Sequence, residues 1–230
     1  MKLELKVLLK SDTTFGSGQG VTGSVDIEVE HDDYGLPFIR GRSIKSLLVE
    51  ECANILYSLT YQKSSADSTL REAAAFLFGR PGSVAVDQGS LRIGPALLPS
   101  QLRHAVMADV DSGRLLPPEV LESLTAIRVQ TSIDAVTGAP EKGSLRASRV
   151  VLRETPFTAT LEFTREAADE HLALLAACVK SVRRGGTGSN RGRGRLMMSL
   201  HKDDDREVTK DYFGYFRDLV RGADIEGNYL

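Results

Sequence analysis

The apolar residues of this chain recur with two periods, and the order in which those periods follow one another is the strongest constraint on its fold. Alternation between apolar and polar residues predicts half-buried strands at 2–10, 25–30, 89–97, 157–164 and 196–200. Apolar residues three and four positions apart predict amphipathic helices at 43–59, 67–78, 165–182 and 207–221. This order predicts an α+β fold, in which an antiparallel sheet carries helices on one face.

Two helix boundaries carry recognisable end signals. Ser43 is predicted to cap the N-terminus of the first helix. Gly79 is predicted to end the second helix. Residues 98–123 between the second helix and the next strands have the composition of short helices and loops.

Composition excludes several classes of protein. The 230 residues are 41% hydrophobic and 26% charged, which is ordinary for a globular chain that buries a core. No apolar run approaches the roughly 20 residues that span a bilayer. The N-terminus alternates like a strand and does not resemble a signal peptide. We therefore expect a cytoplasmic protein with no membrane partner, in which Cys52 and Cys178 are buried free thiols.

Residues 183–195, RRGGTGSNRGRGR, hold five arginines, five glycines and no acid in a chain whose net charge is −2. A dinucleotide-binding motif needs its glycines between a strand and a following helix, whereas these follow a helix and precede a strand. No Gly-Lys-Ser/Thr sequence is present, so a P-loop is excluded as well. Glycine lets backbone amides approach phosphates, and arginine adds bidentate charge. This loop therefore predicts sequence-independent binding to a nucleic-acid backbone.

Residues 126–154 are polar and rich in β-branched side chains, with a Thr-Gly-Ala-Pro turn in the middle. This pattern predicts an exposed hairpin that projects from the core. Ile133 and Val136 near the turn are apolar, and a projecting hairpin rarely displays such residues without a partner. Insertion between nucleotides would give them one.

Four segments, in order, resemble the RAMP proteins of CRISPR systems, and in particular the backbone subunits of type III (Csm- and Cmr-type) effector complexes. The first is VTGSVDIEVEHDDYGLPFIRGRSIKSLL, which is similar to an Asp-bearing segment that leads through a turn into the first helix. The second is FLFG followed by GSLRIGPA. The third is RVQTSIDAVTGAPEKGSLRASRVVLRETPFTATLEF, which resembles the segment that forms a thumb hairpin. The fourth is the arginine–glycine loop at 183–195.

The resemblance implies a single domain over residues 1–230, with a ferredoxin-like (RRM-like) core at about 1–60, 89–97 and 155–230. An insertion would occupy about 61–125, and the thumb about 126–154. It also implies an antiviral ribonucleoprotein in which subunits stack along a guide RNA. The expected partners are guide RNA, complementary target RNA, copies of this chain, other RAMP subunits and a large polymerase-like subunit.

The same resemblance implies an endoribonuclease that cleaves target RNA at regular intervals through an aspartate, with a divalent metal such as Mg²⁺ or Mn²⁺. Asp26 occupies the position of that aspartate. Its carboxylate could hold a metal-bound water or orient the 2′-hydroxyl. Glu28, Glu30, Asp32 and Asp33 are competing acids, and alternation would put Asp26, Glu28 and Glu30 on one acidic, metal-binding strand face.

Further residues carry over from the family motifs. Gly41, Ser43 and Lys45 match the run that opens the first helix, and Arg40 and Arg42 depart from it by adding charge at a helix N-terminus, which attracts phosphate. The loop residues carried over as RNA-binding are Gly185, Gly186, Gly188, Arg191 and Arg193. The hairpin residues carried over as target-RNA contacts are Thr131, Ile133 and Asp134.

Three alternatives stay open at the level of sequence. The first is a filament subunit that binds guide RNA without cutting. The second is a guide-processing endonuclease of the same superfamily, which would need a histidine base from among His31, His104, His171 and His201. The third is an RRM-type RNA binder, which would need aromatic residues on its sheet, whereas aromatics make up only 6% of the chain.

Overall fold

The computed structural model describes residues 1–18, 20, 25–80, 88–134, 136–141 and 143–227. Its strands are β1 (Lys2–Leu9), β2 (Leu91–Ile93), β3 (Thr125–Gln130), β4 (Arg146–Val151), β5 (Pro156–Phe163) and β6 (Leu196–His201). Its helices are α1 (Gly41–Tyr61), α2 (Asp67–Phe78), α3 (Ser100–Asp111), α4 (Pro117–Leu124), α5 (Asp169–Ser181) and α6 (Thr209–Gly227). The predicted mixed α+β class with an antiparallel sheet is confirmed.

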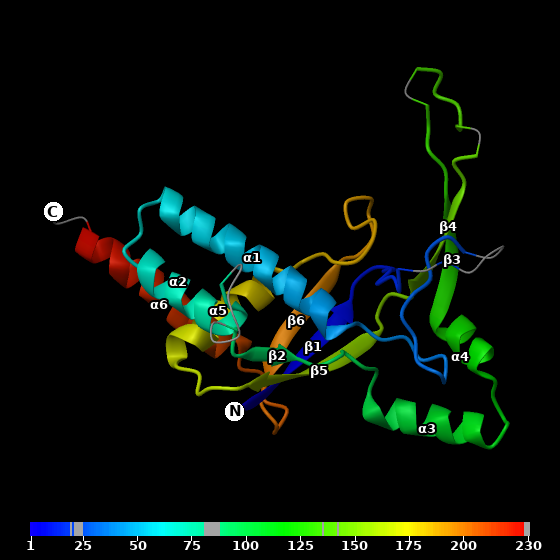
Figure 1. Cartoon of the computed structure of the whole chain (residues 1–230), viewed down its shortest axis with the longest axis horizontal. Coiled ribbons are helices and arrows are strands. Elements are labelled where there is room, and N and C mark those ends of the chain that lie inside the picture. Colours follow the sequence, from blue (N-terminus) through cyan, green and yellow to red (C-terminus); the bar gives the residue numbers. More distant parts are fainter. Residues whose placement is uncertain (19, 21–24, 81–87, 135, 142, 228–230) are drawn as a thin grey trace.

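The main sheet has the strand order β2-β5-β1-β6, with antiparallel neighbours throughout (Figure 1). β1 lies in the middle, so Leu5 pairs with Ala159 of β5 on one side and with Leu200 of β6 on the other. The odd-numbered residues of β1, from Leu3 to Leu9, are at most 1% exposed, as their alternation predicts. The helices cover this face, and the opposite face carries polar residues such as Lys6, Thr160 and Ser199.

Helix α5 is the centre of the helical layer. Every residue from Leu172 to Val179 is buried, because α1, α2, α6 and β6 all pack around it. Cys178 of α5 and Cys52 of α1 are both buried free thiols, as predicted. They meet at the helix interface, and the hydrogen bond between them raises the pKa of Cys178 well above its usual range. No helix in the described parts of the chain is long and apolar enough to cross a membrane.

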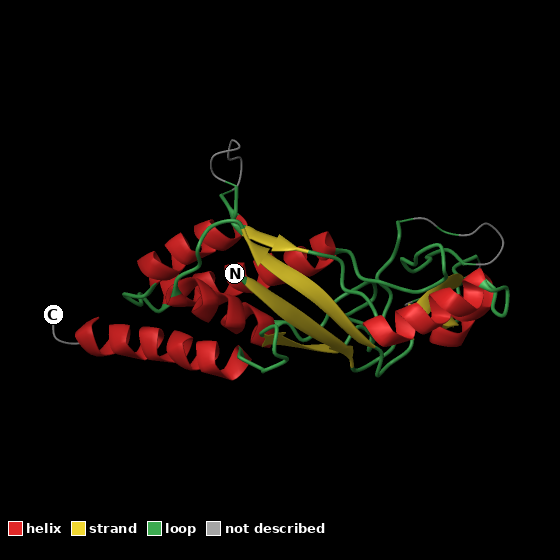
Figure 2. Cartoon of the chain, turned by 90° about the horizontal axis from the view of Figure 1, so that it is seen from below, coloured by secondary structure: helices red, strands yellow, loops and turns green. Residues whose placement is uncertain are grey.

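Strands β3 and β4 form a separate two-stranded hairpin, which stands away from the main sheet beside α3 and α4 (Figures 1 and 2). Beyond the strands, an isolated bridge between Ile133 and Pro140 continues the pairing toward the tip. Ile133 is 61% exposed and Val136 is 93% exposed. The projecting hairpin with exposed apolar residues therefore exists as the sequence predicts.

Three local predictions are wrong. Residues 25–30 form no strand, because their isolated β-bridges go to different parts of the chain: Val29 pairs with Gly16 and Ile27 pairs with Ser148. The strand predicted at 89–97 is regular only in β2. Beyond it, Gly94 N still donates to Thr160 O and Leu97 pairs with Thr158 of β5, but Ala96 between them pairs with Ile39.

Ser43 does not cap α1, which begins at Gly41 with Arg40 in the cap position. A Cβ on Gly41 would lie 2.0 Å from the carbonyl oxygen of Ile93, so only glycine allows the helix to start this close to β2. The prediction that Gly79 ends α2 is confirmed, and its φ of 85° is one that glycine adopts without strain.

His171 near the start of α5 makes the stability of the fold pH-dependent. Its ring stacks on Phe76 with centroids 3.8 Å apart, and its Nδ1 accepts a hydrogen bond from the amide of Ala168 at 2.9 Å. Burial lowers the pKa of His171. Because the folded state favours the neutral ring, its stabilisation is complete above the usual pKa of 6.5 and is lost as pH falls through the lower folded value.

We therefore expect the melting temperature of the wild type to fall between about pH 7 and pH 5 more than that of His171→Gln. Glutamine keeps an acceptor that can reach the Ala168 amide but does not titrate. Thermal melts of both proteins across this range check the expectation. Parallel curves for the two proteins would contradict it.

Candidate nucleic-acid interface

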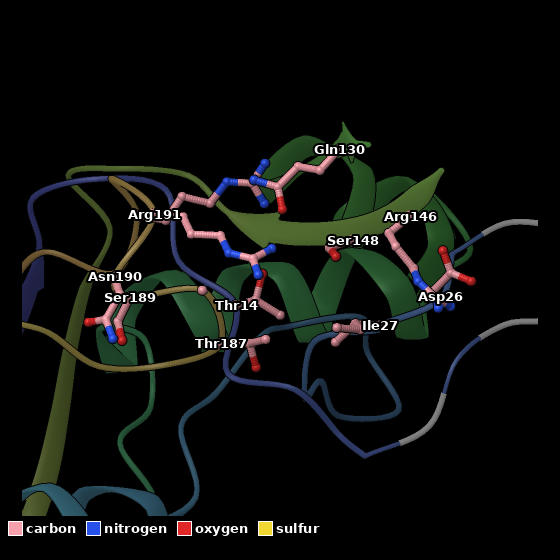
Figure 3. A pocket seen from close by; sticks show the side chains of 12 residues that line it. Thr14, Asp26, Ile27, Gln130, Arg146, Ser148, Thr187, Ser189, Asn190 and Arg191 are labelled. Atoms are coloured by element: carbon pink, nitrogen blue, oxygen red, sulfur yellow. The ribbon is translucent and has the colours of Figure 1, made fainter. Parts of the chain in front are cut away.

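The arginine–glycine loop and the base of the β3–β4 hairpin enclose a cavity of about 580 Å³ (Figure 3). The segment that carries Asp26 forms a third wall. The lining residues are Thr14, Asp26, Ile27, Gln130, Arg146, Ser148, Thr187, Gly188, Ser189, Asn190, Arg191 and Arg193. We call this space the first cavity. It brings together parts of the chain that are up to 179 residues apart, from Thr14 to Arg193.

The loop at 183–195 is an ordered element. Its two arms are joined by an antiparallel bridge between Arg184 and Arg195 and by the hydrogen bond from Gly185 N to Gly194 O at 2.9 Å. The amide of Thr187 donates to the carbonyl of Thr14 at 2.8 Å, which fixes the loop against the segment after β1. A Cβ on Gly186 would lie 2.5 Å from that same carbonyl oxygen. The glycines at the base of the loop therefore permit close backbone packing.

Arg191 and Arg193 present their charge to the first cavity from the distal half of the loop. Figure 3 shows Arg191 on the loop side and Asp26 on the opposite side, next to the hairpin. Among the residues that the structure describes, no acid lies within ion-pairing distance of either guanidinium. Two unpaired guanidinium groups that face one cavity have the charge and geometry to engage phosphate oxygens.

Asp26 is held rigidly while part of its carboxylate stays available. Its amide donates to Ala147 O at 2.8 Å, and its Oδ2 accepts from Ala147 N at 2.7 Å. Asp26 is therefore bound through backbone groups of β4 at the base of the hairpin. Its side chain is exposed, and no partner within the described residues engages Oδ1. This oxygen can accept a proton or bind a cation.

The neighbouring acids do not share the surface of Asp26, contrary to the predicted acidic face. Glu28 is 7% exposed and bonds to Arg149 of β4, whose Nε lies 2.9 Å from its Oε1. Glu30 is also 7% exposed and pairs with Arg40. The predicted acidic face does not form because residues 25–30 are not a strand. Their side chains therefore do not point to opposite sides in regular alternation.

Asp32 and Asp33 lie in the turn that precedes α1. The carboxylate of Asp32 accepts hydrogen bonds from the amides of Tyr34 and Leu36, both at 3.0 Å, and so shapes the turn. Neither Asp32, Asp33 nor His31 lines the first cavity. Asp26 is the acid of its segment that reaches that space.

The residues predicted at the start of α1 do not line the first cavity. Lys45 points toward β2, where its Nζ lies 3.5 Å from Leu91 O, and burial together with the charge of Arg92 lowers its pKa. Arg40 is engaged with Glu30, while Arg42 is exposed. Gly41 and Ser43 belong to the first turn of the helix. The predicted contact of these α1 residues with RNA therefore stays a prediction, and it concerns the surface at the start of α1 and not the first cavity.

Of the predicted loop residues, Gly188, Arg191 and Arg193 line the first cavity, whereas Gly185 and Gly186 form the base of the loop. The predicted hairpin residues lie nearer the tip. Thr131 Oγ1 bonds to Ser144 Oγ at 2.7 Å across the hairpin. Asp134 accepts from Thr137 N at 2.7 Å, and the Thr137 hydrogen bonds hold the pKa of Asp134 below its usual value. Asp134 thus shapes the tip.

Eight lining residues were missed by the sequence analysis: Thr14, Ile27, Gln130, Arg146, Ser148, Thr187, Ser189 and Asn190. Gln130 and Arg146 face each other in the register of β3 and β4, and that register depends on the length of the hairpin loop. Nothing in the local sequence distinguishes these side chains from other polar residues of an exposed hairpin.

The predicted divalent metal would have Asp26 as its main protein ligand. No group of three or more His, Cys, Asp or Glu side chains gathers at one point within the described ranges. A single carboxylate oxygen nevertheless suits Mg²⁺, which keeps several waters and binds through one or two carboxylates together with substrate phosphates. The donor set therefore fits an ion held jointly by Asp26 and by RNA.

Comparison with known proteins identifies the family and the fold of the chain. The family model of the RAMP superfamily matches residues 6–196. Among curated protein sequences, none matches the chain significantly. A chain in the cryo-EM structure of the type III-B Cmr-beta complex in its apo state superposes with a TM-score of 0.61 at 14% identity, covering 88% of this chain and 98% of that one.

A second chain, from the Cmr-beta complex bound to cognate target RNA, superposes with a TM-score of 0.60 at 13% identity. The match covers 92% of this chain and 98% of that chain. At this level of identity the superpositions establish a shared fold. The family match spans most of the sequence, and the chain belongs to the RAMP superfamily, which confirms the resemblance found in the sequence.

Proposed function

We propose that this chain is a guide-RNA-binding backbone subunit of a type III CRISPR interference complex and that it cleaves complementary target RNA through Asp26. The observation that carries the proposal is the first cavity, where Arg191 and Arg193 face an anchored carboxylate across a space of about 580 Å³. Membership of the RAMP superfamily and the shared fold with Cmr-beta chains support the assignment to a type III complex.

The topology supports the finer fold assignment. The core runs β1–α1–β2–β5–α5–β6, apart from the inserted helices and the hairpin, and its sheet order puts β1 and β5 in the centre. Two such β-α-β units with antiparallel strands are the pattern of a ferredoxin-like core. We take the β3–β4 hairpin to be the thumb, with its exposed Ile133 and Val136 available to contact the target strand.

In this proposal, the arginine–glycine loop binds the RNA backbone independently of base sequence. Arg191 and Arg193 can each engage two phosphate oxygens, and the exposed backbone at Gly188 allows RNA to approach closely. Neither feature distinguishes one base from another. Base pairing between guide and target would then provide specificity, as in other RNA-guided systems.

In this proposal, Asp26 promotes attack by a 2′-hydroxyl on the adjacent phosphorus. Its free Oδ1 would accept the hydroxyl proton while the bond from phosphorus to the 5′-oxygen breaks and the leaving oxygen takes a proton from water. The Ala147 amide fixes Oδ2, so the carboxylate needs no reorientation during the step. A bound divalent ion would supply charge stabilisation at the phosphate.

The proposed partners are guide RNA, target RNA, further copies of this chain, other RAMP subunits and a large polymerase-like subunit. An alternative is a subunit that binds guide RNA but does not cut, which the presence of only one carboxylate in the described lining of the first cavity favours. Two other functions have little support. No histidine belongs to that lining, and the open face of the sheet displays no Phe, Tyr or Trp within the described strands.

Arg191→Gln combined with Arg193→Gln tests the binding role of the loop. Each lost phosphate contact removes about 0.7 from the slope of log affinity against log salt concentration for a single strand, so we expect the slope to fall by about 1.4. Titrations of single-stranded RNA at several salt concentrations measure it. RNAs of unrelated sequence should be affected equally.

The matched control is Arg103→Gln with Arg217→Gln, which removes the same charge from a half-buried position on α3 and an exposed position on α6. This variant should keep the wild-type slope. An unchanged slope in the loop variant, or an equal reduction in the control, would show that Arg191 and Arg193 do not contact phosphates.

A further inference from the structure

A second basic cavity lies on the other side of the base of the arginine–glycine loop, between the open edge of β6, the end of α5 and the start of α6. Its volume is about 710 Å³. Six cationic side chains line it: Lys10, Lys180, Arg183, Arg184, Arg195 and Lys210. Glu207 is the one acid among its described lining residues. We call this space the second cavity.

The loop divides its five arginines between the two cavities. Arg191 and Arg193 near its tip line the first cavity, whereas Arg183, Arg184 and Arg195 at its base line the second. The two cavities share no lining residue. The loop therefore acts as a ridge with a cationic surface on each side.

Most of the charge in the second cavity is available to a ligand. Arg183, Arg195 and Lys210 are exposed and form no ion pair with an acid in the described part of the chain. Lys180 lies over the ring of Phe213 at 4.9 Å, a contact that leaves its positive charge uncompensated by any acid. Lys10 lies 3.4 Å from Glu154 at the surface, a distance at which the pair is weak.

The two cavities differ in what they can do to an RNA strand. The first holds three cations, the anchored Asp26 and the hairpin base, whereas the second holds six cations and no group in a comparable catalytic arrangement. The polar side chains other than the charged ones are Ser199 and Thr209, and Thr209 Oγ1 already bonds to the backbone of Leu200. A surface with many cations and few neutral hydrogen-bonding groups recognises phosphates rather than bases.

We propose that the second cavity binds a further stretch of RNA phosphodiester backbone, so that one strand crosses the loop and contacts both cavities. This inference rests on the proposed RNA-binding function of the first cavity. The contacts in the second cavity are electrostatic and independent of sequence, and they retain the strand while chemistry is confined to the first. An acidic segment of a protein is the competing ligand for this surface.

The test uses the variant Arg183→Gln/Arg195→Gln/Lys210→Gln. Arg184 stays unchanged because its Nη1 donates to Ser189 O at 2.8 Å and so supports the shape of the loop. The control is Arg103→Gln/Lys202→Gln/Arg217→Gln, which removes the same charge from one half-buried and two exposed positions outside both cavities. Equal melting temperatures for the wild type and both variants establish that the fold is intact.

Single-stranded RNA of about 16 and about 4 nucleotides, the limits of ordinary single-strand site sizes, should separate the two cavities. With the long RNA, the second-cavity variant should lose about 2 from the salt slope, since three phosphate contacts are removed. The short RNA fits one cavity at a time, so we expect some molecules to bind in the first cavity and others in the second. Arg191→Gln/Arg193→Gln should then reduce binding of the short RNA in the first cavity only. A photocrosslinker attached to Met197→Cys in the second cavity, where Met197 is 54% exposed, should label the long RNA.

Different failures have different meanings. A normal salt slope for the second-cavity variant, together with no crosslink from position 197, would overturn this inference while leaving the first cavity as an RNA site. If that variant instead loses association with other copies of the chain at an unchanged RNA slope, the ligand is an acidic protein surface and the inference is likewise wrong. If the wild type binds no RNA, both the proposed function and this inference fail.

Discussion

Asp26→Asn should reduce cleavage of target RNA by the assembled complex at least about 100-fold, because a positioned acid–base group contributes roughly 10²–10⁴ to the rate. The asparagine side-chain oxygen can still accept the hydrogen bond from Ala147 N, so the backbone connection between this segment and β4 is kept. The variant therefore removes charge and proton affinity without removing the anchor. Single-turnover cleavage of a labelled target measures the rate.

Two companion measurements separate catalysis from structure. Asp26→Ala loses the Ala147 hydrogen bond as well as the carboxylate, so it should be as inactive as Asp26→Asn and somewhat less stable. Both variants should bind guide RNA as the wild type does, since neither alters Arg191 or Arg193. Substantial cleavage by Asp26→Asn would mean that Asp26 is a structural acceptor, and would favour the non-cleaving subunit or another catalytic residue. Chelation by EDTA should stop the wild-type reaction if a divalent ion takes part.

Arg149→Met should lower the free energy of unfolding by about 3–5 kcal/mol, the usual cost of leaving one partner of a buried ion pair uncompensated. Arg149 joins the hairpin to the Asp26 segment through Glu28, with the two side chains only 12% and 9% exposed. Its Nη1 also donates to Thr125 Oγ1 at 3.2 Å, at the start of β3. Urea denaturation of the isolated subunit measures the change.

The double variant Glu28→Gln/Arg149→Met should recover a large part of this loss, because it removes the unpaired charge while glutamine can still accept from Val29 N. Arg128→Met provides a matched control on the same hairpin. Its ion pair with Asp12 is more exposed, with Nη2 2.7 Å from Oδ2 and 47% of the arginine side chain accessible, so its loss should cost less than about 1 kcal/mol. A double variant less stable than Arg149→Met would contradict this account.

The sequence analysis was most successful where a local pattern is sufficient. The alternation in β1 and β5 and the helical spacing in α2 and α5 follow directly from which side chains must face the core. The same rule failed at 25–30, where polar and apolar residues alternate although the backbone pairs first with β4 and then with Gly16 and Phe15. Alternation of polar and apolar residues indicates only that one side of an extended backbone is buried. An extended segment that pairs with several different parts of the chain can show the same pattern without belonging to a sheet.

The site residues also divide into those that the sequence identified and those whose exposure only the packing decided. Arg191 and Arg193 were named from sequence because the arginine–glycine loop stands out locally, and Asp26 because it occupies the position of the aspartate in the family motif. That Asp26 is exposed while Glu28 and Glu30 are buried in ion pairs depends on two arginines, Arg149 and Arg40, and the first of these is distant in sequence. Which of the three neighbouring acids is exposed therefore depends on tertiary packing.

By itself, the sequence determined the class of fold, the projecting hairpin, the two buried cysteines and the concentration of positive charge at 183–195. These follow from residue type and period, which act over a few neighbours. Only the tertiary structure decided that this loop has a cationic cavity on each side and that its tip faces Asp26 beneath the hairpin. The reason is that both cavities are formed between elements far apart in the chain, whose relative positions depend on the pairing of β1 with β6 and of β3 with β4.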